Sequence, residues 1–449
     1  QLSCLLHSLM SQSVSGCQAV AKAKKSVAVV GAGAAGLAVA ATLRRSCLVT
    51  VFERSSDFVG GVWNYSSDRN GGPMYCRLRT NLPKEIMAYP DWEWRRPAGV
   101  SFVDHDSVLE YLRSYCYDQG LDKHILFGQE VLSVSQSASI DDTSPTDTGS
   151  RSWIVQTSRS GPRTFDAVVL ANGHYAKPML PRLPGIENVP SGLVSHSCTY
   201  RRAEDFKDKV VALLGAASSG QDIALELTSS AEHVYLCHRG PRLQSALPKN
   251  LTELYAMDSV SFDANNNQFH IFVSTDDSSS AIGKVQVDHV MFCTGYDYNF
   301  PFLASELTRP SHVPNLYMQV AHCTLPGLFF VGLCTHVVPF PQFHLQSKLI
   351  EAILLGQLQL PDDAESTSLR DEAEKLASGV PARHLHLLGD DQWDYNDQLA
   401  DLAGCQRLPV VMRLIYDDVR LERKLRLVDF RQWAYSITGP DSFEKRFVS

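Results

Sequence analysis

The 449-residue chain lacks several features that would place it in particular protein classes. No apolar run approaches the roughly 18 residues that span a bilayer, and the longest, near residues 325–333 and 349–355, suit core elements. Its 41 Lys and Arg are outnumbered by 49 Asp and Glu, and the net charge of −8 argues against a nucleic-acid surface. The 11 cysteines include no CxxC pair, so neither a disulfide framework nor a metal site is indicated. A globular protein with reduced thiols is predicted.

Two segments instead combine an apolar strand, a glycine-containing turn and a helix, which is the pattern of a βαβ unit. The first unit has strands at Ser26–Val30 and Leu48–Glu53, a turn at Gly31–Gly36 and a helix at Leu37–Arg45. The second has strands at Val210–Leu214 and His233–His238, a turn at Gly215–Gly220 and a helix through Leu227. An α/β fold with two dinucleotide-binding, Rossmann-like domains is therefore expected.

The first turn reads G-A-G-A-A-G and contains Gly31, Ala32, Gly33, Ala34, Ala35 and Gly36. Gly31 allows the tight turn, Gly33 allows backbone N–H groups to approach a pyrophosphate, and Gly36 allows close packing of helix on strand. Glu53 ends the next strand about 20 residues later, where it would accept hydrogen bonds from a ribose hydroxyl. The turn, the helix and the acidic residue together predict a dinucleotide site.

The second turn reads G-A-A-S-S-G and keeps Gly215 and Gly220, with Ala217 in place of the middle glycine. Alanine crowds a phosphate without blocking it, and Ser218 and Ser219 add hydroxyl donors. Arg239 follows the next strand, where the first unit has Glu53. A cation there can pair with a 2′-phosphate, which favours NADP over NAD, although a surface arginine beside a degenerate turn is the alternative.

Other segments are less informative. Residues 130–136 and 153–158 are predicted strands of a hairpin joined by a solvated loop, and 285–293 and 328–333 are further strand candidates. Beyond about Pro361 the chain is more charged and is predicted to be helical. Residues 1–25 form an N-terminal extension, whose apolar start at 2–10 is either the tail of a signal peptide or a simple extension.

Two nucleotide sites, one with an acid and one with a base, suggest FAD in the first and NADPH in the second, with hydride passing to the flavin. Flavin disulfide reductases of this layout need a redox cysteine pair close in sequence, and Cys76 and Cys198 each stand alone. Dioxygen, a quinone or a carrier protein is left as the acceptor.

Five short motifs follow one another along the chain: F-V-G-G-V-W (58–63), Y-C-R-L-R-T-N-L-P-K-E (75–85), L-A-N-G-H-Y-A-K-P-M-L-P (170–181), S-G-L-V-S-H-S-C-T-Y-R (191–201) and F-C-T-G-Y-D-Y-N-F (292–300). In this order they resemble the motifs of flavin-containing monooxygenases, in particular the N/S-oxygenating, dimethylaniline monooxygenase-like members and their soluble arthropod-type relatives. Tyr200, rather than tryptophan, favours N/S oxygenation over Baeyer–Villiger chemistry. The resemblance covers about residues 26–355, and more loosely the stretch near Asp391.

The resemblance implies that NADPH reduces FAD, that reduced FAD forms a hydroperoxide with O2, and that a small nucleophilic amine or sulfide takes the terminal oxygen. It also implies site residues. Asn81 would position or protect the oxygenated flavin, FAD would lie on the first turn, and NADPH on the second. The remaining cofactor-binding residues would be Gly61, Val62, Trp63 and Thr80 on the FAD side, Gln221 and Asp222 on the NADPH side, and Gln346 where a helix N-terminus meets the flavin ring.

Some of these residues have ordinary structural alternatives. Trp63 would otherwise be a core residue, Asn81 a loop cap, and His196 either an NADP contact or a residue that holds the interdomain linker. The chain also departs from the family pattern, with Pro190 where phenylalanine is usual, Ala217 in the second turn, and His344 where an acid is expected. The departures at Pro190 and Ala217 put NADPH affinity in doubt.

The expected domains are an FAD domain at 26–190, an inserted NADPH domain at 191–301, and the second part of the FAD domain with a helical C-terminal region at 302–449. Two rival functions are an NADPH oxidase or quinone reductase on the same fold, and a non-enzymatic nucleotide-binding relative. Since the C-terminal residues 436–449 are not an apolar anchor, a cytoplasmic protein without a membrane anchor, possibly a homodimer, is expected, with the secretory pathway or ER as the alternative.

Overall fold

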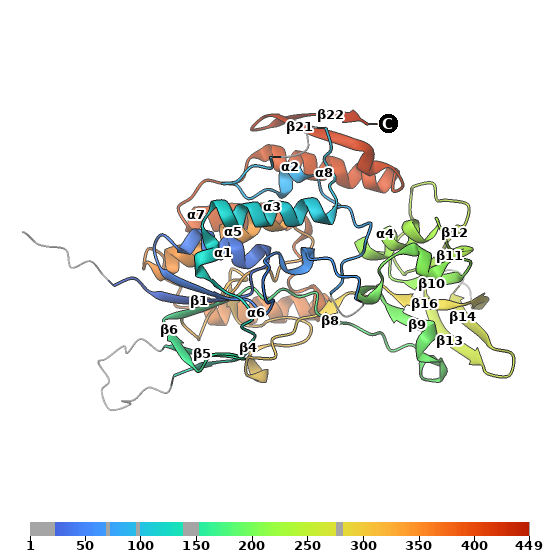
Figure 1. The fold of residues 1–449 in the computed structure, drawn as a ribbon, viewed down its shortest axis with the longest axis horizontal. Coiled ribbons are helices and arrows are strands. Elements are labelled where there is room, and N and C mark those ends of the chain that lie inside the picture. Colours follow the sequence, from blue (N-terminus) through green and yellow to red (C-terminus); the bar gives the residue numbers. More distant parts are fainter. Residues whose placement is uncertain (1–22, 69–71, 96–98, 138–151, 275–281, 449) are drawn as a thin grey trace, which may run out of the picture.

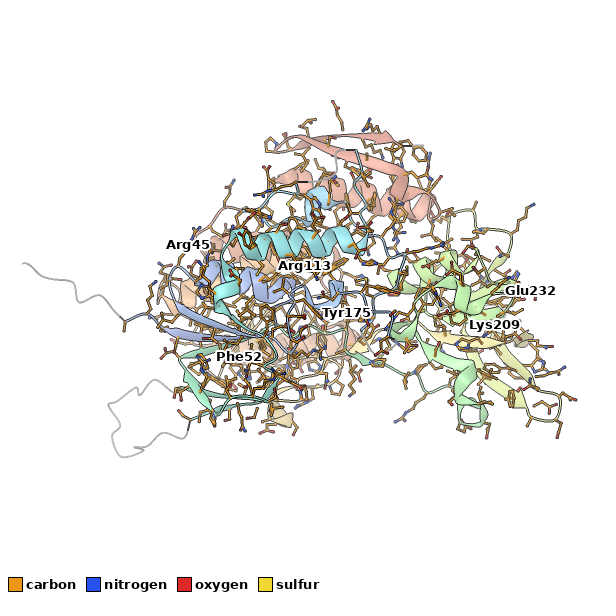
Figure 2. All side chains as sticks on the ribbon, viewed as in Figure 1. Arg45, Phe52, Arg113, Tyr175, Lys209 and Glu232 are labelled. Atoms are coloured by element: carbon orange, nitrogen blue, oxygen red, sulfur yellow. The ribbon has the colours of Figure 1, made fainter. Side chains whose placement is uncertain are left out.

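The computed structural model describes residues 23–68, 72–95, 99–137, 152–274 and 282–448, which form two lobes (Figure 1). The larger lobe contains both the start and the end of the described chain, and the smaller lobe contains the segment between them. Figure 2 places Phe52 in the larger lobe and Lys209 in the smaller one. The two predicted βαβ units therefore lie in different lobes. The predicted N-terminal extension falls largely outside the described residues, and so does most of the loop expected at 137–151.

A mixed sheet in the order β18-β19-β20-β7-β1-β2-β3 forms the centre of the larger lobe. Strand β1 pairs in parallel with β2 and β7, and β18 and β19 add antiparallel strands at one edge. In sheet order, the strands are Leu316–Tyr317, Ala321–His322, Leu328–Phe330, Ala167–Leu170, Ser26–Val30, Leu48–Phe52 and Ile125–Leu126. Because neighbouring side chains point to opposite faces, Val27 and Val29 lie in one core cluster and Ala28 and Val30 in another.

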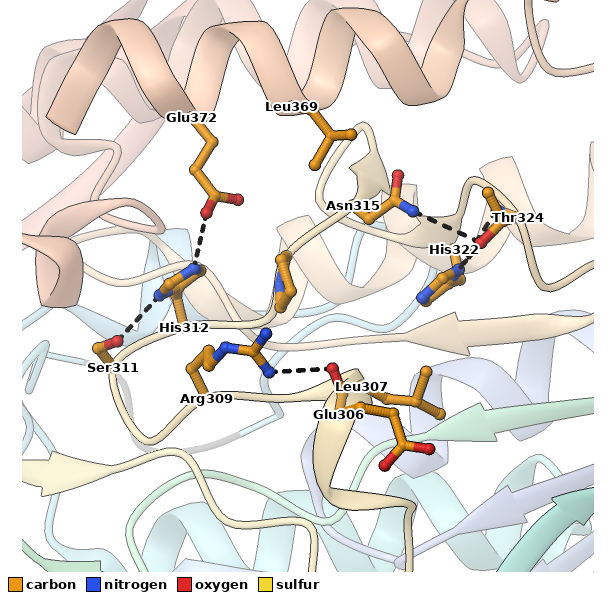
Figure 3. A pocket seen from close by; sticks show the side chains of 11 residues that line it. Glu306, Leu307, Arg309, Ser311, His312, Asn315, His322, Thr324, Leu369 and Glu372 are labelled. Atoms are coloured by element: carbon orange, nitrogen blue, oxygen red, sulfur yellow. Dashed lines mark hydrogen bonds and ion pairs between the residues drawn. The ribbon is translucent and has the colours of Figure 1, made fainter. Parts of the chain in front are cut away.

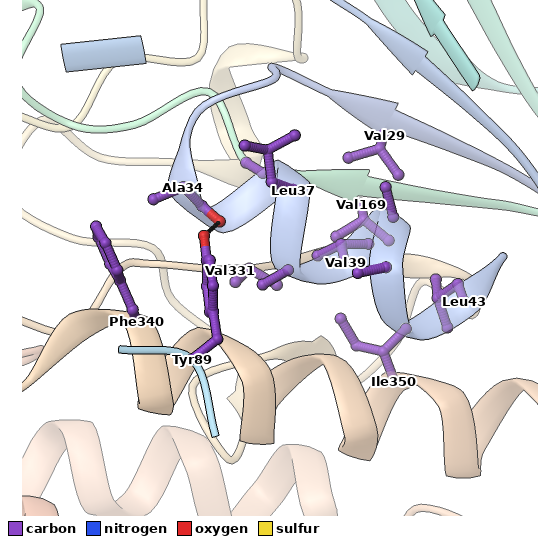
Figure 4. Close-up of a cluster of buried hydrophobic side chains, with 14 of the residues drawn as sticks. Val29, Ala34, Leu37, Val39, Leu43, Tyr89, Val169, Val331, Phe340 and Ile350 are labelled. Atoms are coloured by element: carbon purple, nitrogen blue, oxygen red, sulfur yellow. Dashed lines mark hydrogen bonds between the residues drawn. The ribbon is translucent and has the colours of Figure 1, made fainter. Parts of the chain in front are cut away.

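Helix α1 (Ala34–Leu43) covers one face of this sheet and is itself covered by α5 (Pro339–Leu354) (Figure 4). Leu37 and Leu43 of α1 are fully buried in the same cluster as Ile350 of α5. Tyr89 donates a 2.6 Å hydrogen bond from its hydroxyl to the carbonyl of Ala34, in the first turn of α1. The start of α1 is thus fixed by packing as well as by its glycines.

The other elements of the larger lobe surround this core. The opposite face of the sheet packs against an antiparallel sheet of β4 (Val131–Gln136), β5 (Trp153–Thr157) and β6 (Arg163–Phe165). The remaining helices are α2 (Lys84–Met87), α3 (His105–Asp118), α6 (Ala364–Ala377), α7 (Gln392–Leu402) and α8 (Val410–Leu425). A hairpin of β21 (Trp433–Gly439) and β22 (Ser442–Phe447) lies above α8 (Figure 1).

The smaller lobe repeats the arrangement. Its parallel sheet has the order β12-β11-β10-β16-β9, formed by Leu251–Leu254, His233–Cys237, Val210–Leu214, His289–Phe292 and Val194–His196. Helix α4 (Ser218–Leu227) covers one face, and the antiparallel strands β13 (Met257–Asp263), β14 (Gln268–Ser274) and β15 (Ile282–Val287) cover the other. The two lobes are joined by two crossings, which pair as β8 (Lys177–Pro178) and β17 (Tyr296–Asp297).

The α/β architecture with two Rossmann-type units is the one predicted, and some element limits need correction. The helix of the first unit begins at Ala34, inside the glycine motif, instead of at Leu37. The single strand predicted at 285–293 is wrong, because Asp288 separates β15 from β16 and accepts a 2.7 Å hydrogen bond from the Val210 backbone. The region beyond Pro361 contains the predicted helices, α6, α7 and α8, and it ends in the β21–β22 hairpin, which the sequence does not predict. The domain limits stay predictions.

No helix in the described part of the chain is both long and apolar enough to cross a membrane. The nine cysteines of the described ranges are free thiols, and five of them are buried.

Candidate active site

The first glycine turn is held by Glu53, the acid at the end of β2. Its Oε2 accepts a hydrogen bond from the Ala32 backbone at 2.8 Å, and its Oε1 accepts one from Ser55 at 2.8 Å. The carboxylate is buried, and each oxygen keeps a lone pair for a further donor. Glu53 therefore shapes the turn and still has the capacity to bind the ribose hydroxyl predicted for it.

The outer glycines of the first turn are required by close backbone contacts. Gly31 has a φ of +101°, and a Cβ at Gly36 would lie 1.9 Å from the Gly31 carbonyl oxygen. Gly33 is different, because the nearest atom to a Cβ there would be Gly61 Cα at 3.5 Å. Space is thus left beside Gly33, in front of the unpaired N–H groups of the first turn of α1, and this fits a pyrophosphate.

The second turn has nearly the same backbone as the first. Gly215 has a φ of +110°, and a Cβ at Gly220 would lie 1.8 Å from the Gly215 carbonyl oxygen. Ala217 has φ −75° and ψ −170°, and its counterpart Gly33 has φ −75° and ψ −175°. Any residue adopts this extended conformation, so Ala217 introduces no backbone strain. Its effect is limited to one exposed methyl group at the N-terminus of α4.

Asn81 connects the first lobe with this second turn. Its Nδ2 donates a 3.2 Å hydrogen bond to the Oγ of Ser218, the first residue of α4. Thr80, its neighbour, is buried, and its hydroxyl accepts a hydrogen bond from the Val103 backbone. The structure therefore brings two of the predicted site residues, Asn81 and Ser218, together at the junction of the lobes.

Two arginines of the C-terminal region reach the same end of α4, and the sequence pattern did not indicate them. Arg423 of α8 donates to Ser218 Oγ at 3.2 Å and to Gln221 Oε1 at 2.8 Å. Arg431 forms a 2.6 Å ion pair with Asp222 and donates a 2.8 Å bond from Nε to the Thr80 carbonyl. Gln221 and Asp222, predicted to bind cofactor, thus have protein partners that join the lobes.

Because Asp222 pairs with Arg431, the three residues Arg423, Arg431 and Asp222 together leave one net positive charge near the start of α4. Burial is the main reason that the pKa of Arg423 is lowered, an effect opposed by Asp222 and reinforced by Arg431. The N-terminus of a helix also carries a partial positive charge. An anion at this position would be stabilised by both.

The other predicted NADPH-side residues face solvent. Ala217, which caps α4, and Ser219, the second residue of the helix, are both exposed. Arg239 is exposed, but its predicted equivalence with Glu53 is wrong: Glu53 follows β2 directly, whereas His238 follows β11 directly and Arg239 comes one residue later. This placement leaves its guanidinium accessible to a nucleotide.

Gly61, Val62 and Trp63 form a short 3-10 turn, η1, whose first residue lies against Gly33. The Trp63 ring meets the Phe340 ring of α5 edge to face at 6.5 Å between centroids. Trp63 is half-buried and packs against the main core. It therefore has a core contact on one side.

The placement predicted for Gln346 needs correction. Helix α5 begins at Pro339, so Gln346 lies in its middle instead of at its N-terminus. It is fully buried, its Oε1 accepts from the Gly332 backbone at 3.1 Å, and its Nε2 donates to the Tyr395 hydroxyl at 2.9 Å. Both ends of the amide are used within the chain, so its side chain stabilises the 331–334 turn. His344, where an acid was expected, faces Asp91 at 3.8 Å.

His196 links the two crossings between the lobes. Its Nε2 lies 3.1 Å from the Gly295 carbonyl, and its Nδ1 accepts a hydrogen bond from the Cys198 backbone at 3.1 Å. These contacts define a neutral ring that donates from Nε2, and burial accordingly lowers the pKa of His196. With both ring nitrogens used, the linker role is the better supported of the two alternatives.

A cavity of about 460 Å³ lies elsewhere, at the antiparallel edge of the larger sheet (Figure 3). His312 stands between Ser311 and Glu372 of α6, and Asn315 reaches Thr324. None of the predicted site residues lines this cavity. It is therefore not part of the site formed by the two glycine turns.

Comparison with known proteins supports this interpretation of the turns. The sequence model of the flavin-binding monooxygenase-like family matches residues 24–262 and 260–446. Flavin-containing monooxygenase FMO GS-OX-like 7 of Arabidopsis thaliana is 35% identical over 415 residues, which cover 85% of this chain and 85% of that protein.

Solved structures agree with the fold. S-allyl-L-cysteine S-oxygenase from Allium sativum is 31% identical, with a TM-score of 0.80 over 91% of this chain and 95% of that one. Tmm from Pelagibacter sp. is 21% identical, with a TM-score of 0.76 over 94% of this chain and 96% of that one, and shows the fold alone. Two glycine turns, the motifs between them and these matches lead to one conclusion: the chain belongs to the flavin-binding monooxygenase-like family, whose members are oxidoreductases that use FAD and NADPH.

Proposed function

We propose that this protein uses NADPH and O2 to oxygenate a nucleophilic sulfur or nitrogen atom of a small molecule. The observation that carries the proposal is the contact between Asn81 and Ser218, because it joins the flavin side of the site to the start of the second nucleotide-binding helix. When bound, NADPH would supply a hydride, and FAD would accept it and activate dioxygen. The side chains of the protein then have to bind the two cofactors, orient the substrate and exclude water.

FAD would lie on the first turn, in a domain formed by residues 26–190 and 302–449. The residues from Gly31 to Gly36 and the N-terminus of α1 would bind its pyrophosphate, and Glu53 its ribose. The space beside Gly33 supports this assignment, because a Cβ there would meet only Gly61 at ordinary contact distance. The 3-10 turn Gly61–Trp63 would cover the bound nucleotide from the other side.

NADPH would lie on the second turn, in a domain formed by residues 191–301. The first turn of α4, with Gly215, Ser218, Ser219 and Gly220, would bind its pyrophosphate, and the exposed Arg239 its 2′-phosphate. The cationic environment of Arg423 supports an anion at this position. Ala217 would reduce the affinity slightly, since it adds a methyl group without changing the backbone.

Asn81 would be the residue that acts on the oxygenated cofactor. An amide can donate one hydrogen bond while it accepts another, so Asn81 could hold an oxygen atom and remain fixed by Ser218. Exclusion of water around it would prevent wasteful release of hydrogen peroxide. Its attachment to α4 means that the arrangement at Asn81 depends on how the second lobe is docked.

Sulfur is the preferred acceptor over nitrogen. The solved relative that is 31% identical over most of the chain is an S-oxygenase. A soft, neutral sulfide also needs no charged partner in the pocket, whereas an amine must first lose its proton to become a nucleophile.

Isotope labelling tests the proposal. The FAD-loaded protein is incubated with NADPH and ¹⁸O2 and with either S-allyl-L-cysteine or a tertiary amine, and the masses of the products are measured by mass spectrometry. One ¹⁸O atom in a sulfoxide, formed with about one NADPH consumed, is the expected result. NADPH consumption with unlabelled substrate and peroxide as the product would instead support an oxidase, and label in the amine alone would overturn the preference for sulfur.

A further inference from the structure

The cavity at the antiparallel edge of the larger sheet is bounded on one side by a helix that is only loosely packed. Its volume of about 460 Å³ is within the range of small-molecule pockets. Helix α6 lies over it, and Ala364 is the only buried residue of that helix. Leu369 and Glu372, one helical turn apart, point from α6 toward the cavity (Figure 3). The helix thus presents one apolar and one acidic side chain to a ligand.

The loop opposite α6 supplies a cation. Arg309 lines the cavity, and its Nη1 donates to the main-chain carbonyls of Glu306 at 2.9 Å and Thr308 at 3.2 Å. These bonds orient the guanidinium without neutralising it, because a carbonyl group carries no net charge. Within the described ranges Arg309 forms no ion pair. Its Nε and Nη2 donors are therefore available for a carboxylate.

A second donor comes from β19. His322 is only 6% exposed and lines the same cavity. Its Nδ1 accepts a hydrogen bond from the Thr324 backbone at 3.3 Å, so the proton of the neutral ring is on Nε2. Burial lowers the pKa of His322, an effect that Glu365 opposes, and so favours the neutral ring. This Nε2 has no hydrogen-bond partner among the described residues, although polar groups of buried side chains normally have one.

Glu372 supplies the acceptor. Its Oε1 lies 3.1 Å from Nε2 of His312, and Nδ1 of His312 lies 2.9 Å from the Ser311 hydroxyl. The imidazole thus uses both of its nitrogens and fixes the position of the carboxylate. The other oxygen, Oε2, has no partner in the part of the chain that the structure describes, and the Glu372 side chain is 24% exposed. A cationic group of a ligand can therefore reach it.

The cavity thus combines a cation and a neutral donor with a carboxylate, and Leu307, Pro314 and Leu369 add apolar side chains to its lining. A simple anion or a simple cation would leave one of the charged groups uncompensated. We propose that the cavity binds a free α-amino acid with an apolar side chain, with its carboxylate on Arg309 and His322 and its ammonium group on Glu372. None of the residues of the two glycine turns lines this cavity, so the proposal does not depend on the proposed function.

Isothermal titration calorimetry of the full, FAD-loaded chain with L-norleucine is the first test. Norleucine has no sulfur atom, and the titration contains no NADPH, so oxygenation contributes no heat. The expected result is saturable binding at one site. Pentylamine, which lacks the carboxylate, and hexanoate, which lacks the ammonium group, are each expected to bind at least ~10-fold more weakly.

Two substitutions in the lining test the location of the site. Arg309→Gln and Glu372→Gln are each expected to weaken norleucine binding at least ~10-fold. Arg370→Gln and Glu374→Gln are the matched controls, because these two residues of α6 form an ion pair outside the cavity. Both controls are expected to bind norleucine like the parent. Flavin content and melting temperature show whether each variant is folded, and the ligand series on the parent tests the charge pattern without any substitution.

Three results would overturn the proposal. The first is a parent chain that does not bind norleucine at millimolar concentration. The second is equal binding by the parent and by both lining variants, which would place norleucine elsewhere on the protein. The third is binding of pentylamine or hexanoate as tight as that of norleucine, because the cavity would then select a cation or an anion alone.

Discussion

Arg431 and Asp222 are 209 residues apart in sequence and form a 2.6 Å ion pair between the C-terminal region and the second turn of α4. Their side chains are only 15% and 12% exposed, respectively. The same arginine also binds the Thr80 carbonyl, next to Asn81. The C-terminal region thus holds the second nucleotide-binding helix in register with the segment that carries Asn81.

Replacement of Arg431 by Gln is expected to loosen this docking. Removing one partner from a fully buried ion pair costs roughly 3–5 kcal/mol, and the remaining exposure here reduces that to about 1–2 kcal/mol. Flavin reduction by NADPH should slow several-fold, and more of the NADPH consumed should appear as peroxide. Arg77→Gln is the control, because the Arg77–Glu204 pair is exposed on both sides and should contribute little. Equal effects of the two variants would contradict the assigned role.

Ala217→Gly is expected to lower the KM for NADPH with little change in melting temperature. The Ala217 backbone is extended, so glycine is not required there, and only the methyl group near the phosphate site is removed. Steady-state kinetics at saturating oxygen measure the change. An unchanged KM would show that the methyl group does not face the nucleotide.

Gly220→Ala is expected to have the opposite and larger effect. The new Cβ would lie 1.8 Å from the Gly215 carbonyl oxygen, so α4 would have to move away from β10. The variant should keep its FAD, since the first turn is untouched, but lose reduction by NADPH at least ~10-fold, or about 1.4 kcal/mol in the barrier. Loss of FAD from this variant would argue against separate nucleotide sites.

Glu53→Gln is expected to weaken FAD binding. The carboxylate accepts hydrogen bonds from both Ala32 and Ser55, and an amide would present its NH2 group to one of these donors. Leaving a buried donor unsatisfied costs about 1–3 kcal/mol, or roughly a 5- to 150-fold rise in the dissociation constant. The dissociation constant is measured from the fluorescence of the FAD that is released when the protein is diluted.

Glu226 of α4 is expected to make stability depend on pH. Burial raises the pKa of its carboxyl group to about 7, although the Tyr200 hydroxyl partly opposes this. The unfolded chain releases this proton near pH 4.5, whereas the folded chain keeps it until about pH 7, so stability falls as pH rises between these values and is constant above them. Between these pH values we expect the free energy of unfolding of the wild-type chain to fall by on the order of 1–3 kcal/mol because of this group. Urea titrations at a series of pH values measure this fall, and Glu226→Gln is expected to remove it.

The sequence was sufficient to predict the two βαβ units, because glycine at the tight turn and at the helix–strand contact is imposed locally. Gly36 and Gly220 each lie against the carbonyl of the first glycine of their own turn. Asn81 and Ser218, in contrast, meet across 137 residues of chain, and Arg423 and Arg431 reach α4 across more than 200. Such pairs depend on how the two lobes dock, and no local sequence pattern predicts that docking.

Local misreadings had different causes. The run 285–293 has the composition of one strand, but Asp288 binds the Val210 backbone and divides it between two sheets. The family resemblance predicts Gln346 at a helix N-terminus, whereas α5 begins seven residues earlier, with Pro339 and Pro341 in its first turn. The C-terminal hairpin was missed because its strands follow a long charged helix and pair only with each other.

Stopped-flow absorbance of the FAD-loaded protein is the most direct test of the central claim, that the second turn delivers a hydride to a flavin on the first turn for use with oxygen. The protein is reduced with NADPH and then mixed with oxygenated buffer, with and without a sulfide. Fast bleaching of the flavin, followed by a long-lived near-ultraviolet absorbance that the sulfide removes, is the predicted result. Failure of NADPH to bleach the flavin, or direct return to oxidised flavin with an equal amount of peroxide, would contradict the account.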